Sequence, residues 1–193
     1  MAVPLLEPAE ARMANPETEK TFLVITAVGP DRPGIVSDLS ATIHAAGANL
    51  EDSRMAALGG EFAVLLLASG TESALTRLER DLAETEATLG LRVLTKRTTA
   101  PRPDRRVLPY AIRVSGFDRP GIVQAVTGTL ARRGVNVRSL ESRLAYAPHS
   151  GTPLFVLEAE LEVPSELTLA ELRRELSAKC DEENLDLTFE AAR

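Results

Sequence analysis

The sequence predicts an α+β protein made of two tandem copies of one small unit, each ordered strand, helix, strand, strand, helix, strand. The first observation is a repeat: the hexapeptide Asp-Arg-Pro-Gly-Ile-Val at residues 31–36 recurs unchanged at residues 118–123, an offset of 87. The second is that the agreement extends beyond the hexapeptide, because Asn49 and Asn136 share this offset. Such a repeat is typical of a duplicated fold unit, so the 193 residues divide into two domains.

The first unit opens with a strand and a turn. Residues 21–28 are β-branched and apolar, which is typical of a strand, and glycine and proline at residues 29–34 force the chain to turn. A helix is expected over about residues 34–46, because apolar residues recur there every three or four positions. Gly47 then predicts a helix end in the left-handed conformation.

A hairpin, a second helix and a last strand complete the unit. Residues 49–58 and 61–68 flank Gly59-Gly60, which predicts two antiparallel strands joined by a two-residue loop. Residues 71–89 predict an amphipathic helix, and residues 91–98 predict a closing strand. The order of elements is therefore βαββαβ.

The second unit repeats this order with two expected differences. Matching Ser53-Arg54 to Ser142-Arg143 predicts a two-residue insertion inside the element that follows Asn136. Residues 146–152, rich in proline, glycine and serine, replace the tight hairpin by a longer loop. The expected strands span residues 107–115, 136–145, 153–162 and 186–189, and the expected helices span residues 121–133 and 165–184.

This element order is that of the ferredoxin-like, or split βαβ, fold, in which both helices cover one face of an antiparallel sheet. In the first strand Leu23 and Ile25 point to one face. Phe22, Val24 and Val28 point to the other, so both faces are apolar. The outer face is therefore expected to pack against the sister unit or a second copy of the chain, and a homodimer is predicted.

The expected domains are residues 21–98 and 107–193, preceded by a loose tail at residues 1–20 and joined by a linker at residues 99–106. The only concentration of positive charge lies around this linker and is interpreted as solvated. It comprises Lys96, Arg97, Arg102, Arg105 and Arg106.

The tail has neither the basic start nor the apolar core of a secretory signal, so a cytoplasmic location is expected. The longest apolar stretch, at residues 62–68, is too short to span a bilayer, so no membrane partner is expected. The single cysteine, Cys180, excludes an intrachain disulfide. Because it follows leucines spaced by three or four, Cys180 is predicted to be a core thiol.

Charge and composition narrow the classes of partner. The net charge of −6 and the pI near 5.1 disfavour binding to a phosphate backbone, so no direct nucleic-acid partner is expected. Aromatic residues make up 4% and tryptophan is absent, which weakens an RNA-recognition module because that module stacks bases on aromatic side chains.

Neither a metal site nor a catalytic centre is indicated. His44 and His149 have no partner at a metal-ligand spacing, so both are expected at the surface, and no metal or cofactor is assigned. Glu51, Asp52 and the acidic run at residues 181–183 are interpreted as ordinary strand-edge and helix-end charges. No nucleophile with a neighbouring base is visible, so no catalytic residue is assigned.

The repeated turns resemble the ACT domain, an amino-acid-sensing regulatory module. The matching segments are Gly-Pro-Asp-Arg-Pro-Gly-Ile-Val at 29–36, Gly-Phe-Asp-Arg-Pro-Gly-Ile-Val at 116–123, Gly-Ala-Asn-Leu at 47–50 and Gly-Val-Asn-Val at 134–137. The resemblance covers about residues 21–98 and 107–190. As a tandem pair, the chain resembles the glycine cleavage system transcriptional repressor family.

The resemblance implies a small amino-acid ligand held where the strand-to-helix turn of one unit meets the early second strand of another. Glycine at Gly29 and Gly34 lets the backbone approach a ligand, and the helix opening at Gly34 presents unpaired N–H groups that suit a carboxylate. Asp31 is expected to cap the helix or to accept a bond from a ligand ammonium, while Asn49 offers both a donor and an acceptor. The candidate ligand-binding residues are Gly29, Asp31, Gly34, Ile35, Ala48, Asn49, Asp118, Gly121, Ile122, Val135 and Asn136.

The same residues also have a purely structural interpretation, which stays open. Asp-x-Pro-Gly before a helix and Gly-x-Asn after one are good turn chemistry on their own. Arg32 and Arg119 are interpreted as solvated surface side chains, in preference to steering a carboxylate or bridging the domains. The halves are not equivalent, since Phe117 stands where the first unit has Pro30, and duplication permits one half alone to keep a ligand site.

The leading hypothesis is a non-enzymatic regulator that binds a small amino acid, glycine or another product of one-carbon metabolism, at interfaces between ACT units. It modulates gene expression through a protein partner, because the chain is acidic and shows no helix-turn-helix pattern. The alternative classes are an interaction scaffold without a ligand and a small ferredoxin-like hydrolase.

Overall fold

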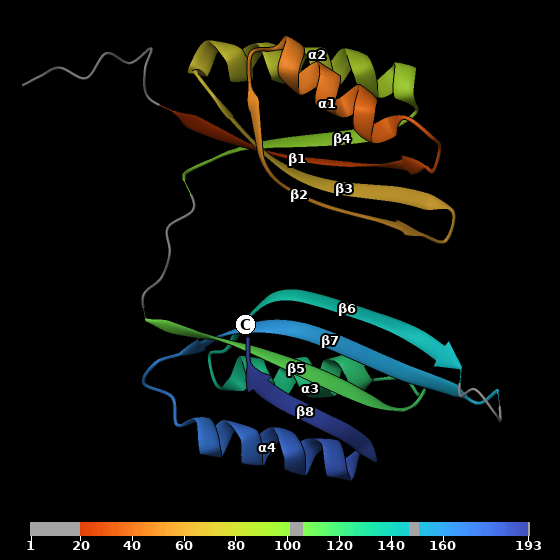
Figure 1. The fold of residues 1–193 in the computed structure, drawn as a ribbon, viewed down its shortest axis with the longest axis vertical. Helices are drawn as coiled ribbons and strands as arrows, with labels where there is room; N and C mark the ends of the chain where they lie inside the picture. Colours follow the sequence, from red (N-terminus) through yellow and green to blue (C-terminus); the bar gives the residue numbers. More distant parts are fainter. Residues whose placement is uncertain (1–19, 101–105, 147–150, 193) are drawn as a thin grey trace, which may run out of the picture. The chain divides into compact units, whose positions relative to one another are not determined.

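The computed structural model describes residues 20–100, 106–146 and 151–192, and it divides into two compact units between residues 102 and 103. Each unit has the predicted order of elements, and its four antiparallel strands form one sheet. Both helices of a unit lie on the same side of its sheet (Figure 1). The prediction of two α+β, ferredoxin-like domains is confirmed.

The first domain consists of β1 (Thr21–Pro30), α1 (Ile35–Ala45), β2 (Asn49–Leu58), β3 (Glu61–Gly70), α2 (Glu72–Leu89) and β4 (Arg92–Thr98). Its strand order is β2-β3-β1-β4, so β2 and β4 are the edges. Gly59 and Gly60, with φ of 62° and 90°, form the two-residue hairpin loop. Helix α2 begins where the Thr71 hydroxyl accepts a bond from the Ala74 N–H at 3.2 Å, and it ends at Gly90 with φ of 68°.

The second domain consists of β5 (Val107–Phe117), α3 (Ile122–Arg132), β6 (Asn136–Tyr146), β7 (Pro153–Pro164), α4 (Leu169–Glu182) and β8 (Leu185–Ala191). Its strand order, β6-β7-β5-β8, is that of the first domain. The last helix begins later than predicted, because residues 165–168 form a turn in which the Ser165 N–H donates to the Arg106 carbonyl at 2.7 Å. The helix ends before Asn184, whose φ is 49°.

The alignment of the two domains differs from the prediction inside the second strand. Both β2 and β6 carry a bulge after their second residue, and strand pairing keeps the offset of 87 beyond it. Arg54 therefore corresponds to Glu141 rather than to Arg143, and the predicted two-residue insertion is wrong. The extra residues all lie in the hairpin, since Glu61 corresponds to Leu154, an offset of 93. A loop absorbs added length more easily than a paired strand, where a slip by one residue moves every side chain to the other face.

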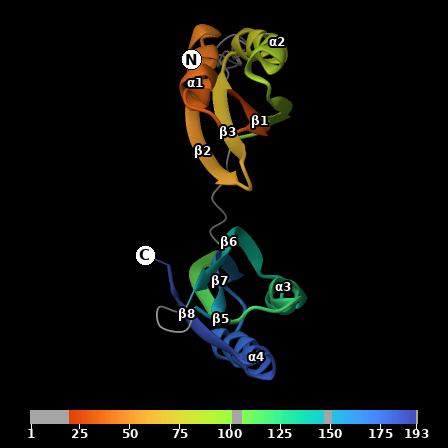
Figure 2. The ribbon, with the colours of Figure 1, turned by 90° about the vertical axis from the view of Figure 1, so that its right-hand side faces the viewer.

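Each domain has its own hydrophobic core between its helices and its sheet, and Figure 2 shows this layering from the side. In the first domain Leu39 of α1, Leu78 of α2 and Leu23 of β1 belong to one buried cluster. In the second domain Cys180 is 2% exposed and belongs to the core, which confirms the prediction of a core thiol. Burial raises the pKa of this thiol to about 11, so it is protonated at neutral pH.

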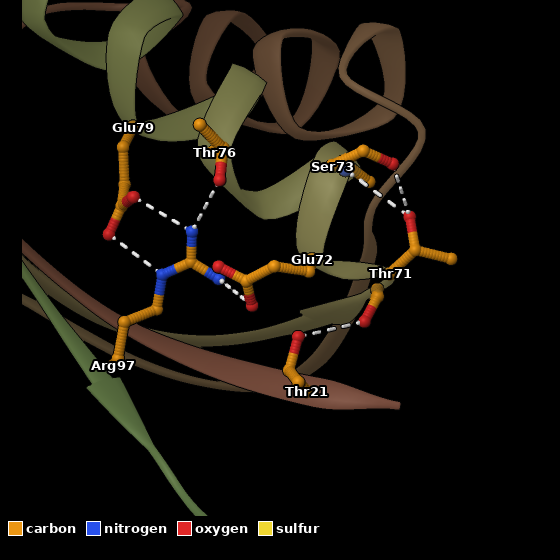
Figure 3. A network of polar contacts seen from close by, with 9 residues as sticks. Thr21, Thr71, Glu72, Ser73, Thr76, Glu79 and Arg97 are labelled. Atoms are coloured by element: carbon orange, nitrogen blue, oxygen red, sulfur yellow. Dashed lines mark hydrogen bonds and ion pairs between the residues drawn. The ribbon is translucent and has the colours of Figure 1, made fainter. Parts of the chain in front are cut away.

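Arg97 was expected within a solvated basic linker, and this interpretation is wrong. It lies on β4 and points toward the helices (Figure 3), where its guanidinium donates to both carboxylate oxygens of Glu79 at 3.0 and 2.8 Å. It also donates to Glu72 at 3.1 Å and to the Thr76 hydroxyl at 3.1 Å. Arg97 therefore connects the last strand to α2. Arg102 and Arg105 of the same basic group lie outside the described residues.

Candidate functional site

The two strand-to-helix turns have the same backbone conformation. Gly34 has φ 95° and ψ −12°, and Gly121 has φ 95° and ψ −5°. Each glycine is the N-cap of its helix in the left-handed region, where a Cβ would be strained, and neither helix has a side-chain cap. The first intrahelical bonds run from Asp38 N–H to Gly34 O and from Ala125 N–H to Gly121 O, at 2.9 Å each. The N–H groups that precede Asp38 and Ala125 in each helix have no intrahelical acceptor and no side-chain cap, which is the arrangement that attracts an anion.

Asp31 does not cap the helix as predicted. Its own N–H donates to the Gly60 carbonyl at 3.2 Å, which pins the turn to the tip of the β2–β3 hairpin. Helix α1 begins at Ile35, four residues later, too far along the chain for the Asp31 carboxylate to be its N-cap. The carboxylates of Asp31 and Asp118 are both exposed.

Gly29 and its equivalent Gly116 are required by close packing inside each domain. A Cβ at Gly29 would lie 2.7 Å from the Gly90 carbonyl oxygen and 2.9 Å from Leu91 Cδ2. A Cβ at Gly116 would lie 2.6 Å from Leu185 Cδ2. The absence of a side chain thus lets the first strand of each domain pass closely beside the segment that enters its last strand.

Three of the predicted ligand residues belong to the cores. Ile35 is 2% exposed, Ile122 is 3% and Val135 is 6%. Their side chains pack inward, so only main-chain groups are available to a ligand, beside the turns for Ile35 and Ile122 and before β6 for Val135.

The start of β2 holds a polar cluster that sequence reasoning missed. The Glu51 carboxylate accepts bonds from Lys20 at 2.5 Å, from the buried Ser69 hydroxyl at 2.5 Å and from the Asn49 amide at 3.1 Å. These bonds, led by Lys20, lower the pKa of Glu51 to about 2. Ala48 and Asn49 line an adjoining hollow of about 360 Å³ together with Lys20 and Ser69. Glu51 sits at the bulge, a register irregularity that the sequence does not announce.

The second domain keeps the asparagine but pairs it differently. Asn136 donates to Glu162 on the neighbouring strand at 2.7 Å, whereas Asn49 donates to a carboxylate on its own strand. In both domains one amide proton is bound to a carboxylate, and no bond to the amide oxygen is found in the described residues. Each amide oxygen is therefore available to a further donor.

Within one domain the turn and the start of the second strand lie at opposite ends of the sheet. Pro30 pairs with Glu61, whereas Asn49 pairs with Ser69. These partners are eight residues apart on β3, about 26 Å at a strand rise of roughly 3.3 Å. The second domain repeats this separation. The structure thus groups the predicted residues into two clusters in each domain and does not bring both clusters together within either one.

The turn of the second domain opens onto a groove of about 610 Å³ between α3 and α4. Gly121, Ala125 and Gly128 line one wall, and Ala178 and Lys179 line the other. Small side chains on α3 leave this space between the helices.

The two motif arginines have different partners. Arg32 folds over its own helix and donates to Asp38 at 3.2 Å and to the Pro33 carbonyl at 3.2 Å. Arg119 reaches the end of α4 and donates to the carboxylate and carbonyl of Glu183. Lys179 and, secondarily, Arg119 lower the pKa of that carboxyl. Both arginines are exposed, as expected for surface side chains, and each also makes these contacts.

Among the described residues, no group of three histidine, cysteine or carboxylate side chains is placed to hold a metal ion. His44 is exposed on α1, as expected, and His149 lies outside the described residues. No helix in the described part of the chain is long and apolar enough to cross a bilayer.

Comparison with known families decides the domain type. Models of the ACT domain match residues 21–96 and residues 110–177. The chain belongs to the ACT domain family. It is a tandem pair of regulatory ACT domains, and the match falls on both halves of the internal repeat.

Whole-chain relatives share this tandem arrangement. The glycine cleavage system transcriptional repressor of Escherichia coli K12 is 34% identical over 164 residues, which cover 84% of this chain and 86% of that protein. A structure of an unknown protein from Galdieria sulphuraria is 33% identical, with a TM-score of 0.74, and the match covers 91% of this chain and 100% of that one. A crystal structure provisionally named as a glycine cleavage system transcriptional repressor is 30% identical, with a TM-score of 0.69, over 90% and 98% of the two chains.

Proposed function

We propose that this tandem ACT protein is a non-enzymatic regulator that binds a small amino acid where two ACT domains meet and modulates gene expression through a protein partner. The name of the Escherichia coli relative concerns repression of the glycine cleavage system, so glycine is the first ligand to test.

The observation that carries the proposal is the separation of the two recognition clusters. The bare helix amides at Gly34 lie about 26 Å along the sheet from the asparagine of the same domain, far more than any free amino acid spans. A ligand that uses both clusters must therefore take its turn from one domain and its second strand from another. We therefore expect the ligand at a junction between two ACT domains, whose closure the ligand itself promotes.

The chemistry of the two clusters is complementary to an amino acid. The unpaired amides beside Gly34 and Gly121 suit the ligand carboxylate. The free amide oxygen of Asn49, beside the ionised Glu51, suits the ligand ammonium. Because the ligand would favour the arrangement that joins both clusters, it would shift the population toward that arrangement and change the surface offered to a partner.

A protein partner is favoured over nucleic acid by the charge of the chain. With a net charge of −6, direct binding to a phosphate backbone is unfavourable. The effect on transcription therefore passes through another regulator.

Calorimetry with a panel of amino acids, glycine first, tests the proposal. Asn49→Ala and Asn136→Ala remove the amide oxygen from one domain each, and a ligand-binding domain should lose affinity by roughly tenfold or more. Ser40→Ala, at an exposed position of α1, is the matched control and should leave binding unchanged. Absence of heat with every amino acid in the panel, supported by unchanged thermal unfolding, would refute ligand binding.

An interaction scaffold is the second candidate, because the outer face of the first sheet exposes large apolar side chains such as Leu65 and Leu94. A hydrolase is less well supported, because the single thiol is buried with a raised pKa and cannot serve as a ready nucleophile. Turnover of an acyl phosphate or a formyl substrate that disappears in Asn49→Ala would revive the enzyme.

A further inference from the structure

The outer face of the first-domain sheet, on the side away from its helices, is apolar at its centre. Leu65 is 47% exposed, Val28 is 42% and Leu94 is 71%. Strand pairing places these side chains in one continuous patch. The first-domain outer face comprises Phe22, Val24, Thr26, Val28, Ala63, Leu65, Leu67 and Leu94, with Asp52 and Arg54 on the β2 edge and Arg92 and Lys96 on the β4 edge.

The second domain is an internal control for this face, because the same fold carries different side chains there. Strand pairing equates Leu65 with Glu158 and Leu67 with Glu160. Leu94 corresponds to Thr188 in the same way. A sheet of this architecture therefore does not need an apolar outer face in order to fold. The exposed leucines of the first domain are therefore not required by the fold and mark a surface for interaction with a partner.

We propose that a second copy of this chain covers the first-domain outer face, in a symmetric dimer that stacks the two first-domain sheets face to face. This inference is independent of the proposed ligand. The sister domain is a poor cover, because its equivalent face is charged. It carries Glu141, Glu160 and the Glu158 that is ion-paired with Arg113 and Arg143, and burying these groups against leucine would cost their desolvation.

A two-fold axis along the strands fits the charges of the face. Such an axis lies between the two sheets and places β2 of one copy over β4 of the other. Residues that pair across one sheet then face the same row of residues in the second copy. The row of Asp52, Leu67, Val24 and Lys96 then sets Asp52 against Lys96 of the second copy, and Leu67 against Val24. An axis across the strands through the same row would instead set Asp52 against Asp52 and Lys96 against Lys96 of the second copy, which is repulsive. Within one chain Asp52 also accepts a bond from Arg54 at 2.6 Å, so Lys96 of the second copy is a further partner for it.

The face is large enough for such a dimer. Four strands spaced about 4.8 Å apart and about eight residues long cover roughly 500 Å², so two faces together bury roughly 1,000 Å². This area is near the lower bound for a specific interface, and a concentration-dependent dimer is expected.

The first test gives Leu65 the residue of its second-domain equivalent. Analytical ultracentrifugation of the full chain should show a dimer at tens of micromolar, and Leu65→Glu should raise its dissociation constant roughly a hundredfold, because each dimer loses two buried leucines and gains two desolvated carboxylates. Leu144→Glu, at a position 50% exposed in the second domain, is the matched control and should leave the dimer intact. Circular dichroism melting of the two variants checks that both fold.

The second test identifies the pairing across copies. Asp52 and Lys96 lie on opposite edges of the sheet, about 14 Å apart, and cannot pair within one copy. Asp52→Lys and Lys96→Asp should each weaken the dimer roughly tenfold, and an equimolar mixture of the two variants should recover it, because the mixed dimer restores both opposite-charge contacts. A monomeric wild-type chain, a Leu65→Glu variant that dimerises normally, or no recovery in the mixture would each overturn the proposal. A wild-type monomer that Leu65→Glu makes more extended would indicate cover by the sister domain.

Discussion

The two domains share one backbone and carry opposite outer faces. Their helix openings agree in φ at 95°, and their edge strands bulge at the same place. Yet Arg92 of β4 corresponds to Asp186 of β8, and Lys96 corresponds to Glu190. Duplication preserves what the fold needs, namely the core-facing positions and the turns. It leaves the outward side chains free to diverge, so these are the positions at which the two domains differ most in charge.

The domains also secure their last strands by different contacts. In the first domain Arg97 of β4 donates to carboxylates of α2, on the helix side of the sheet. In the second domain Arg173 of α4 reaches back to donate to the Phe189 carbonyl of β8 at 2.5 Å and lies 5.5 Å from the centre of its ring. The contact between helix and last strand is common to both, although the residue that makes it has changed element.

The largest expected effect tests whether the two cores are independent. Leu176→Ala removes a fully buried side chain and should lower the free energy of unfolding of the second domain by about 3 kcal/mol. Modification of Cys180, in the same core, should accelerate accordingly. Leu78→Ala, equally buried in the first domain, should cause a similar loss in urea unfolding without faster Cys180 modification. Equal acceleration by both variants would show that the domains open as one unit.

The paired glycines sharpen the comparison at the next level. Gly29→Ala should cost about 2 kcal/mol, because the nearest obstacle to a Cβ is the rigid Gly90 carbonyl at 2.7 Å. Gly116→Ala should cost about 1 kcal/mol, because its nearest obstacle is the end of the Leu185 side chain, which can rotate, and the backbone oxygen is 3.0 Å away. Chemical denaturation of both variants measures the difference, and a larger loss at Gly116 would contradict this reasoning.

The arginines that hold the last strands should contribute less. Arg97→Ala should lower the free energy of unfolding of the first domain by about 1 kcal/mol, because the variant loses the ion pairs with Glu72 and Glu79, which are partly exposed. Arg97→Lys should recover only part of this, because lysine cannot form the paired bonds to Glu79. Arg173→Ala, which loses one carbonyl acceptor, should cost the second domain about half as much. Thermal unfolding of the three variants ranks them.

The smallest effect is a difference in acid sensitivity. The folded-state pKa of Glu51 is about 2, below its ordinary value of 4.5, so its contribution to stability is present above pH 4.5 and is lost as the pH falls toward 2. Arg138 occupies the equivalent bulge and cannot contribute in this range. Carboxyl titration by nuclear magnetic resonance should place the Glu51 midpoint near 2, and Glu51→Gln should flatten this part of the acid profile of the first domain. A midpoint near 4.5 would show that the bonds from Lys20, Ser69 and Asn49 do not stabilise the Glu51 carboxylate.

Sequence patterns predicted the elements well where local chemistry determines them. Gly59-Gly60 predicted the hairpin, and Gly47 and Gly90 marked helix ends, because few other residues adopt a positive φ without strain. The predictions failed where contacts between distant residues decide. Matching the identical residues Ser53-Arg54 and Ser142-Arg143 suggested an insertion after Asn136, but strand pairing placed the extra residues in the hairpin.

The candidate site shows the same limit. The motif led to Gly34 and Asn49 directly, yet Glu51 and Ser69 joined the site only through a bulge and a neighbouring strand. Of the two roles that the motif suggested for Asp31, the helix cap is wrong, because the cap position depends on where the backbone enters the helix. Gly29 was assigned to ligand approach, and the close passage of Gly90 and Leu91 gives a further reason for glycine there that the motif does not show.

By itself the sequence determined the duplication, the order of elements, the apolar faces and the ACT motif, because each of these depends on spacing along the chain. Only the tertiary structure decided that the turn and the asparagine lie at opposite ends of each domain, and that Leu65 and Glu158 occupy equivalent places. The physical reason is that strand register, set by hydrogen bonds between segments far apart in sequence, determines which side chains share a face.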